Sequence, residues 1–296
     1  MKYAHFADLH IGSWREDNLR ELSTQTFLKA MDACRNQQVD FILFSGDIFN
    51  TPLPAIESLK MITKKLKELQ DSGIPIYVIP GSHDFSPSGK TMIDVLENAG
   101  LLVNVCKGQV VEGTLQLRFT TDQKTGAKLT GMMGKKGMLD RVYYEHLDRE
   151  ALEKEPGYKI FLFHTALSEL KPDHLKEMEA YPLSLLPRGF NYYAGGHVHH
   201  RSQIEPEGYG LMTYPGALFP NNFAELEKYS YGGYYVVTVN ETQQSIEWLP
   251  VKVREHIPVD IDGHHQTPDE IMSQVRRALQ DKDLGGALIT IRLSGT

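Results

Sequence analysis

The sequence predicts an α/β fold in which a second sheet packs on a largely parallel first sheet, as a two-sheet β-sandwich flanked by helices. Within residues 1–105, short apolar runs alternate with segments whose apolar residues recur at helical spacing. Residues 106–250 instead carry short strand candidates separated by turn residues. With 296 residues, of which 41% are apolar, the chain can bury the core that this fold requires.

The first part of the chain is expected to alternate strands and helices. Its strands are predicted at residues 3–6, 40–44, 74–79 and 101–105. Its helices are predicted from about residue 18, from about residue 54 and over about residues 90–98. Asn18 is a residue type suited to an N-cap, and Gly73 is placed to end the second helix as its C′ residue. This alternation is typical of an α/β unit with a largely parallel sheet.

The second part is expected to consist mainly of strands. The candidates lie at residues 110–111, 115–119, 129–133, 160–163, 192–194, 211–214, 234–239 and 246–249. The chain contains no internal repeat and no low-complexity tract that would favour a solenoid or a disordered region. These strands are therefore assigned to a second sheet, packed on the first.

A small α+β appendage is expected over residues 251–296, after a main domain over residues 1–250. Thr267 and Glu270 have the spacing of a capping box, and Pro268 occupies the favoured N1 position, so a helix should begin there. A final strand is predicted over residues 287–293. Because the chain ends almost directly after it, we expect the appendage to be incomplete.

The composition limits the classes of function. The chain has 31 basic and 38 acidic residues, a net charge of −7, so its overall charge does not favour nucleic acid. Nucleic-acid binding would depend on a local basic patch or on bound cations. The two cysteines, Cys34 and Cys106, form no CxxC pair and are expected to be reduced core residues. A cytoplasmic location without a membrane partner is expected, because neither a signal peptide nor a long apolar run is present.

Carboxylate and imidazole side chains follow five of the predicted strands, at the point where each strand ends. They are Asp8 and His10, Asp47, His83 and Asp84, His164, and His197 and His199. In open α/β sheets, functional sites gather outside the carboxyl ends of the strands. Each motif alone is common by chance, but the ordered set indicates one site at one edge of the sheets.

The residue types indicate a dinuclear metal site. Mixed oxygen and nitrogen ligands without a thiolate suit Mn, Fe or Zn. The candidate ligands are Asp8, His10, Asp47, His164, His197 and His199. They are too many for one four-coordinate ion with an open position, so we expect two ions that share a bridging carboxylate. In both Asp8-x-His10 and His197-x-His199, alternate residues of an extended segment would point the same way.

These motifs resemble those of the calcineurin-like metallophosphoesterase family. The matching segments are Asp8-Leu9-His10, Gly46-Asp47, Gly81-Ser82-His83-Asp84, His164 and Gly196-His197-Val198-His199. Within the family, the sequence is most similar to the SbcD-type nuclease subunits of double-strand-break repair, with Tyr214-Pro215-Gly216-Ala217 as further support. The resemblance covers residues 1–250 and implies the family's four-layer fold, and residues 251–296 resemble the start of a DNA-capping domain.

The resemblance implies a role for each ligand. Asp47 would bridge two metal ions, Asp8, His10 and His199 would complete one site, and His164 and His197 the other. The family usually has Asn where this chain has Ser82, and that Asn carbonyl is a ligand of the second metal. Because a Ser hydroxyl is a neutral oxygen donor of shorter reach, the second site is expected to be weaker or to contain a water that Ser82 orients.

The resemblance also implies the acid of the reaction. His83 would protonate the leaving oxygen, and Asp84 would hold its ring. An imidazole that titrates near neutrality is a suitable general acid, and a carboxylate can fix its tautomer.

A manganese-dependent DNA nuclease with two Mn²⁺ is the leading interpretation. The resemblance implies 3′ to 5′ exonuclease action on double-stranded ends, endonuclease action on single strands, a homodimer and an SbcC-like coiled-coil ATPase partner. It also implies a nucleoid-associated location, or a nuclear one in a eukaryote. DNA phosphates would meet a basic stretch, for which an ordinary solvated loop is the alternative. This stretch contains Lys124, Lys128, Lys135, Lys136 and Arg141.

Two other functions remain open. The same metal centre would serve a phosphoesterase that acts on a cyclic nucleotide, a nucleotide or a phosphoprotein, because the ions contact only the phosphate. The capping appendage and the basic stretch distinguish the nuclease from this alternative. The third possibility is a DNA-end-binding scaffold with weak catalysis, which only Ser82 favours and which the presence of His83 opposes.

Overall fold

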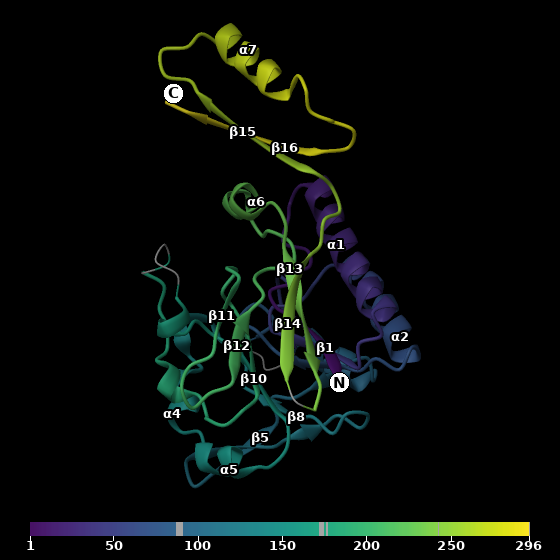
Figure 1. The fold of residues 1–296 in the computed structure, drawn as a ribbon, viewed down its shortest axis with the longest axis vertical. Coiled ribbons are helices and arrows are strands. Elements are labelled where there is room, and N and C mark those ends of the chain that lie inside the picture. The colour runs from purple at the N-terminus through teal and green to yellow at the C-terminus, as the bar shows by residue number, and fades with distance from the viewer. Residues whose placement is uncertain (87–90, 172–174, 176, 242, 296) are drawn as a thin grey trace.

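Two six-stranded sheets form the centre of the computed structural model, which describes residues 1–86, 91–171, 175, 177–241 and 243–295 (Figure 1). The first sheet has the strand order β14-β13-β1-β2-β3-β4. Its strands are β1 (Lys2–Phe6), β2 (Phe41–Ser45), β3 (Ile76–Ile79), β4 (Val103–Asn104), β13 (Gly233–Val239) and β14 (Gln244–Pro250). Strands β1 to β4 run parallel, whereas β13 is antiparallel to β1 and to β14.

The second sheet has the strand order β11-β12-β10-β9-β8-β7. Its strands are β7 (Thr120–Thr121), β8 (Lys128–Gly131), β9 (Lys159–His164), β10 (Tyr192–Gly196), β11 (Ser202–Ile204) and β12 (Leu211–Tyr214). The four inner strands run parallel, and the two edge strands are antiparallel. The carboxyl ends of β9 and β10 therefore lie side by side, as do those of β1 and β2.

The inner faces of the two sheets bury one apolar core between them. Tyr3 and Phe41 of the first sheet stack with their ring centroids 4.9 Å apart, and they pack with Ile160 and Tyr192 of the second sheet. These side chains alternate along their strands with residues that face outward, as expected for strands buried on both faces of a sandwich. The predicted two-sheet sandwich is confirmed.

Helices cover the outer face of each sheet. Helices α1 (Asp17–Asn36), α2 (Ile56–Asp71) and α3 (Met92–Asn98) bury their apolar sides on the first sheet. Helices α4 (Arg141–Glu145) and α5 (Arg149–Lys154) and short 3₁₀ turns cover the second. A hairpin of β5 (Gly108–Val111) and β6 (Thr114–Leu117) borders this layer. The order helix, sheet, sheet, helix gives four layers (Figure 1).

Some of the predicted helix and strand boundaries are confirmed, and others differ in the structure. Gly73 has φ +73° directly after α2, and its N–H donates to Gln70 while that of Ile74 donates to Leu69, which ends the helix as predicted. The predicted N-cap Asn18 is wrong, because α1 already begins at Asp17. Helix α3 begins after a capping box at Thr91, and the earlier start predicted near residue 90 falls outside the described residues. The strand predicted over residues 101–105 is shorter in the structure, where β4 contains only Val103 and Asn104.

The appendage contains strand β15 (His256–Asp262), helix α7 (Pro268–Leu279) and strand β16 (Leu288–Ser294). The capping box of Thr267 and Glu270 forms as predicted, whereas β15 was not predicted. The two strands are parallel, and their apolar residues pack against α7 in a cluster of their own. An ion pair between Arg292 and Glu227 joins this unit to helix α6 (Phe223–Tyr229), which lies between it and the sheets (Figure 1). Among the described helices, none has the length and apolar character needed to cross a membrane.

Candidate metal centre

Four strand ends meet at one edge of the sandwich and carry the candidate metal ligands. Asp8 follows β1, Asp47 follows β2, His164 ends β9, and His197 follows β10. Because β1 and β2 are neighbours in one sheet and β9 and β10 in the other, facing sheets bring the four side chains together. This is the clustering that the strand-end motifs predict.

The Asp47 carboxylate lies at the centre of the cluster. Its Oδ2 is 3.2 Å from His164 Nε2, 3.6 Å from His10 Nε2 and 3.4 Å from Ser82 Oγ. Its Oδ1 accepts a hydrogen bond of 2.7 Å from the backbone N–H of His83. One carboxylate thus has contacts to both halves of the cluster, which is the arrangement expected of a bridging ligand.

A second group of donors lies around Asp8. His10 Nε2 is 3.1 Å from His199 Nε2, and Asp8 Oδ1 is 4.0 Å from His10 Nε2 and 3.8 Å from His199 Nε2. Both Asp8 oxygens accept the His197 N–H at 3.0 Å, and the His197 ring lies beside that of His164, with centroids 5.3 Å apart. Among the described residues, three triplets of donors could each hold an ion, and the predicted ligand His197 belongs to none of them. These are Asp8, His10 and His199; Asp8, Asp47 and His164; and His10, Asp47 and His83.

The donor set of this cluster fits divalent cations. Carboxylate oxygens of Asp8 and Asp47 converge with imidazole nitrogens, and the buried Nε2 of His164 lies 3.2 Å from Asp47 Oδ2. Carboxylate oxygen and imidazole nitrogen are common ligands of divalent transition metals. The oxygen and nitrogen donors present therefore fit a dinuclear centre of divalent ions.

The backbone at the ligands is strained rather than extended. Asp8, His10, Asp47 and His197 have φ values of 52°, 42°, 53° and 84°, in the left-handed region that non-glycine residues rarely occupy. The expectation that the alternate residues lie on extended segments is therefore wrong. Backbone bonds hold the strained turns, including His10 N–H to the Asp47 carbonyl at 2.9 Å. Such strain is typical of functional sites, where surrounding structure fixes a costly conformation.

Two glycines allow the strand ends to approach. A Cβ on Gly81 would lie 2.3 Å from Asp47 Oδ1, and a Cβ on Gly196 would lie 2.0 Å from the Ser45 carbonyl oxygen. Both distances are far below a permitted contact, so the close packing of the ligand loops requires glycine at these positions.

The pKa values of the histidines in the cluster are shifted in opposite directions. Burial opposes the charge of His164, but the Asp47 carboxylate outweighs it and raises the pKa of His164 to about 10. Burial likewise opposes ionisation of Asp47, yet His164 holds the pKa of that carboxyl well below its usual range. Burial and His199 lower the pKa of His10 to about 3, and burial and His164 lower that of His197 to about 4. His10 and His197 are thus neutral donors near neutral pH, the form that a metal ligand needs.

The profile of the calcineurin-like phosphoesterase family matches residues 1–201. The chain belongs to this family. Calcineurin-like phosphoesterases use a dinuclear divalent-metal site, and the cluster around Asp47 has the donors for one. The match begins at the first residue and includes every candidate ligand from Asp8 to His199.

The chain is also similar to archaeal proteins named DNA double-strand break repair protein Mre11. That of Methanococcus maripaludis is 28% identical over 248 residues, which cover 79% of this chain and 61% of the relative. That of Methanopyrus kandleri is 28% identical over 296 residues, which cover 94% of this chain and 63% of the relative. The chain thus spans less than two thirds of the length of these two relatives. A dimetal phosphatase from Danio rerio shares the fold, with a TM-score of 0.52, 10% identity and coverage of 85% of this chain and 98% of that one.

The expected partnership of His83 and Asp84 is not formed. His83 Nδ1 lies 2.8 Å from the backbone carbonyl oxygen of Asn50, which orients the ring. The Asp84 carboxylate instead accepts the backbone N–H groups of Ile48, Phe49 and Gly81 at 3.0 to 3.2 Å. Burial, with the nearby Asp47 charge, raises the pKa of Asp84 to about 7. Asp84 therefore joins the loops after β2 and β3 through its three backbone hydrogen bonds. The His83 ring is oriented by the Asn50 carbonyl instead.

Glu225 contacts a candidate metal ligand, and the strand-end motifs do not reveal it. Its Oε1 lies 2.9 Å from His199 Nδ1, and its Oε2 accepts the Asn221 N–H at 2.8 Å. Carboxylates commonly hold the second nitrogen of a metal-binding histidine in this way, which fixes the tautomer and orientation of the ring. The sequence carries one signal for this region, because Asn222 and Glu225 have the spacing of a capping box. Asn222 caps α6, and Glu225 occupies the third position of that helix.

Replacing Glu225 should weaken metal binding without removing a ligand. We expect Glu225→Ala to lower Mn²⁺ affinity about 10- to 100-fold, because the His199 ring loses its fixed tautomer. Calorimetric titration of the apo protein measures this change. Glu227→Ala, on the same helix but paired with Arg292, is the matched control. Equal affinity in the Glu225 variant and wild type would contradict the orienting role.

Ser82 offers a shorter donor than the family's usual Asn. Ser82 is 6% exposed and its hydroxyl is 3.4 Å from Asp47 Oδ2, so it lies within the cluster. We expect Ser82→Asn to tighten the weaker of two Mn²⁺ binding steps, because the amide carbonyl reaches further than the hydroxyl. A two-site calorimetric titration distinguishes the steps, and an unchanged second step would argue against Ser82 as the cause of a weak site.

The predicted basic stretch does not form one patch. Lys124 pairs with Asp40 at 2.7 Å and Lys128 with Glu155, and both lie at the end of the sandwich opposite the ligand loops, since Asp40 directly precedes β2. Arg141 pairs with Glu145 at 2.8 Å. Lys135 and Lys136, in contrast, line a pocket of about 400 Å³ together with Ser82, His83, His164 and His197.

Proposed function

We propose that this chain is the nuclease part of a DNA double-strand-break repair protein. It would hydrolyse DNA phosphodiesters with two Mn²⁺, as a 3′ to 5′ exonuclease on double-stranded ends and an endonuclease on single strands. The observation that carries the proposal is the Asp and His cluster around Asp47. The similarity to Mre11 proteins over 79% to 94% of the chain supports DNA as its substrate.

The chain's own residues would divide the chemistry as follows. Asp8, His10, Asp47, Ser82, His164, His197 and His199 would hold the cations. Two bound cations would clamp the phosphate and generate the nucleophile from water. His83 would donate the proton that the leaving oxygen requires, from a ring that Asn50 orients. Asp84 would keep the loop of His83 in place through its three backbone hydrogen bonds.

Lys135 and Lys136 are the basic residues best placed to contact DNA phosphates. The Lys135 ammonium donates to Tyr143 at 2.8 Å and lies over the rings of Phe85 and Tyr143, whereas Lys136 is exposed. Both line the pocket beside His83. Phosphates approaching the metal ligands would therefore meet two cations, in a protein whose net charge is −7.

Reversing these two charges should weaken DNA binding. We expect Lys135→Glu with Lys136→Glu to reduce affinity and lower the salt slope of binding by about 2, one for each lost phosphate contact. Fluorescence anisotropy across a salt series measures both. Lys124→Glu with Lys128→Glu makes the same charge change at the opposite end and should have little effect. An unchanged slope in the first variant would exclude these lysines as phosphate contacts.

Further partners belong to the same proposal. Residues 251–296 would be the start of a DNA-capping domain, and the chain would act as a homodimer with an SbcC-like coiled-coil ATPase. Two exposed apolar side chains near the start of α2 would suit a protein interface, since Leu53, just before the helix, is 82% exposed and Ile56, its first residue, is 78% exposed. The association would take place on DNA, in the nucleoid or the nucleus.

A nuclease assay tests the proposal. An end-labelled linear duplex is incubated with Mn²⁺, with Mg²⁺ or with a chelator, and Asp47→Ala serves as the inactive control. Loss of 3′ nucleotides that requires both Mn²⁺ and Asp47 is the expected result. Intact DNA together with Asp47-dependent hydrolysis of a small phosphodiester would instead favour a phosphoesterase of a nucleotide, cyclic nucleotide or phosphoprotein. Inactivity on both with DNA ends still bound would favour the scaffold.

A further inference from the structure

A second pocket adjoins the metal ligands, and it shares no lining residue with the pocket of Lys135. It has a volume of about 320 Å³, and its lining includes His199 and Glu225. The same His199 ring faces His10 through Nε2, so one wall of the pocket is also part of the metal cluster. A group held in this pocket would lie next to whatever the cluster holds. Its volume is at the small end of the range for small-molecule sites.

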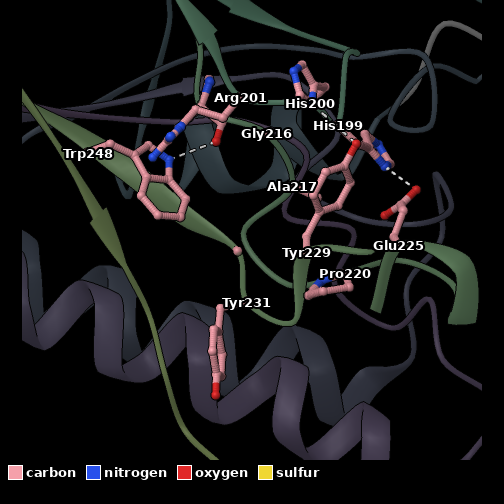
Figure 2. Close-up of a pocket in the computed structure, with 12 residues that line it drawn as sticks. His199, His200, Arg201, Gly216, Ala217, Pro220, Glu225, Tyr229, Tyr231 and Trp248 are labelled. Carbon is pink, nitrogen blue, oxygen red and sulfur yellow. Dashed lines mark hydrogen bonds and ion pairs between the residues drawn. The ribbon is translucent and has the colours of Figure 1, made fainter. Parts of the chain in front are cut away.

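Aromatic side chains form part of the wall of this pocket. Tyr229, Tyr231 and Trp248 are among its lining residues, although the ring of Tyr231 points away from the other two in Figure 2. Tyr229 and Trp248 are half-buried, so each retains surface for a ligand. Because aromatic rings offer flat apolar faces, they suit a planar, weakly polar group better than a free phosphate.

A cation lies over one of these rings. The guanidinium carbon of Arg201 is 4.7 Å from the centroid of Trp248, and the indole N–H donates to the Pro215 carbonyl at 3.0 Å (Figure 2). Arg201 is exposed, so its planar guanidinium can stack on a further ring or contact a phosphate. Pro215, Gly216 and Ala217 form the adjoining wall. Gly216 has φ +80°, and a Cβ there would clash with the His199 carbonyl oxygen at 2.9 Å, so this close approach requires glycine.

We infer that this pocket binds the nucleobase of the nucleotide whose phosphate is at the metal ligands. Unpaired bases are held by stacking on aromatic rings and on guanidinium planes, and the pocket offers both beside His199. The base would have to leave the duplex, as the last base of a strand does most readily. This inference rests on the proposed function, because it gives the binding site for the base of the proposed DNA substrate.

Two esters with the same leaving group test the pocket in the Mn²⁺-loaded protein. Thymidine 5′-(p-nitrophenyl phosphate) carries a base, and methyl p-nitrophenyl phosphate does not. Trp248→Leu should raise the KM of the thymidine ester about tenfold more than that of the methyl ester, because stacking is lost. Trp248→Phe should keep most of the preference, although both variants lose the hydrogen bond to Pro215. Equal effects on the two esters would overturn the inference.

A binding measurement keeps the two proposals distinguishable. Thymidine itself, which has no phosphate, should quench the fluorescence of Trp248 in the metal-free protein, whereas inorganic phosphate should not. The apparent Kd for thymidine should rise about tenfold in Tyr229→Leu and change little in Tyr229→Phe. Hydrolysis of neither ester together with this quenching would refute the proposed function but support the pocket. Absence of quenching, or equal quenching in both Tyr229 variants, would overturn the pocket and leave the nuclease proposal standing.

Discussion

Asp47→Asn is expected to reduce Mn²⁺-dependent hydrolysis at least about 10³-fold. Asp47 has contacts to His10, His164 and Ser82, so removing its charge affects both halves of the cluster. The loss corresponds to several kcal/mol of stabilisation that the clamped cations give to the transition state. The amide keeps the size of the side chain, so the loops should remain folded. Initial rates at saturating Mn²⁺, together with a metal titration, measure the change.

Asp122→Asn is the matched control for this variant. Asp122 is also buried, and its carboxylate accepts a hydrogen bond from Tyr77 at 2.8 Å near the β7–β8 turn, remote from the ligand loops. The same chemical change there should leave the rate per folded molecule unaffected, although it can cost stability. If Asp47→Asn retained more than about a tenth of the activity, Asp47 would not be the shared ligand.

His83→Ala is expected to lower the rate on DNA about 10²- to 10⁴-fold, the usual contribution of a general acid. The leaving group in DNA is an alkoxide, which needs a proton as it departs. A p-nitrophenolate leaves without one, so the same variant should lose less than about threefold on thymidine 5′-(p-nitrophenyl phosphate). The ratio of the two losses is the quantity to measure, with the exposed His146→Ala as a control for removal of a histidine.

The His83 comparison also tests a competing role. His83 lies with His10 and Asp47 in one of the three donor triplets, so it could serve as a metal ligand. A ligand would matter equally for both leaving groups, and its loss would weaken Mn²⁺ binding. Equal losses on the two substrates with reduced metal affinity would therefore replace the proton-donor role with a ligand role.

The placement of the candidate ligands follows from local sequence. Buried strands such as Phe41–Ser45 are followed within two residues by a carboxylate, here Asp47, and parallel neighbours bring such residues to one edge. The helix end at Gly73 and the cap at Thr267 could also be predicted, because each depends on residues within one turn of the helix.

Features that depend on distant partners could not be predicted. Glu225 orients His199 across 26 residues, and Lys124 pairs with Asp40 across 84, so sequence spacing reveals neither. Asp84 is adjacent to His83 in the chain, yet backbone N–H groups of another loop take its carboxylate. Strand β15 shows an alternating apolar pattern, but Pro258 within it weakens the strand signal.

The number of bound ions is the most direct test of the dinuclear centre. The metal-free protein is titrated with Mn²⁺, the bound metal is counted per chain, and its electron paramagnetic resonance spectrum is recorded. We expect two tightly bound ions per chain with an exchange-coupled spectrum, and loss of the coupling in Asp47→Asn. A single ion with an uncoupled spectrum, unchanged in Asp47→Asn, would contradict a centre built around a bridging Asp47.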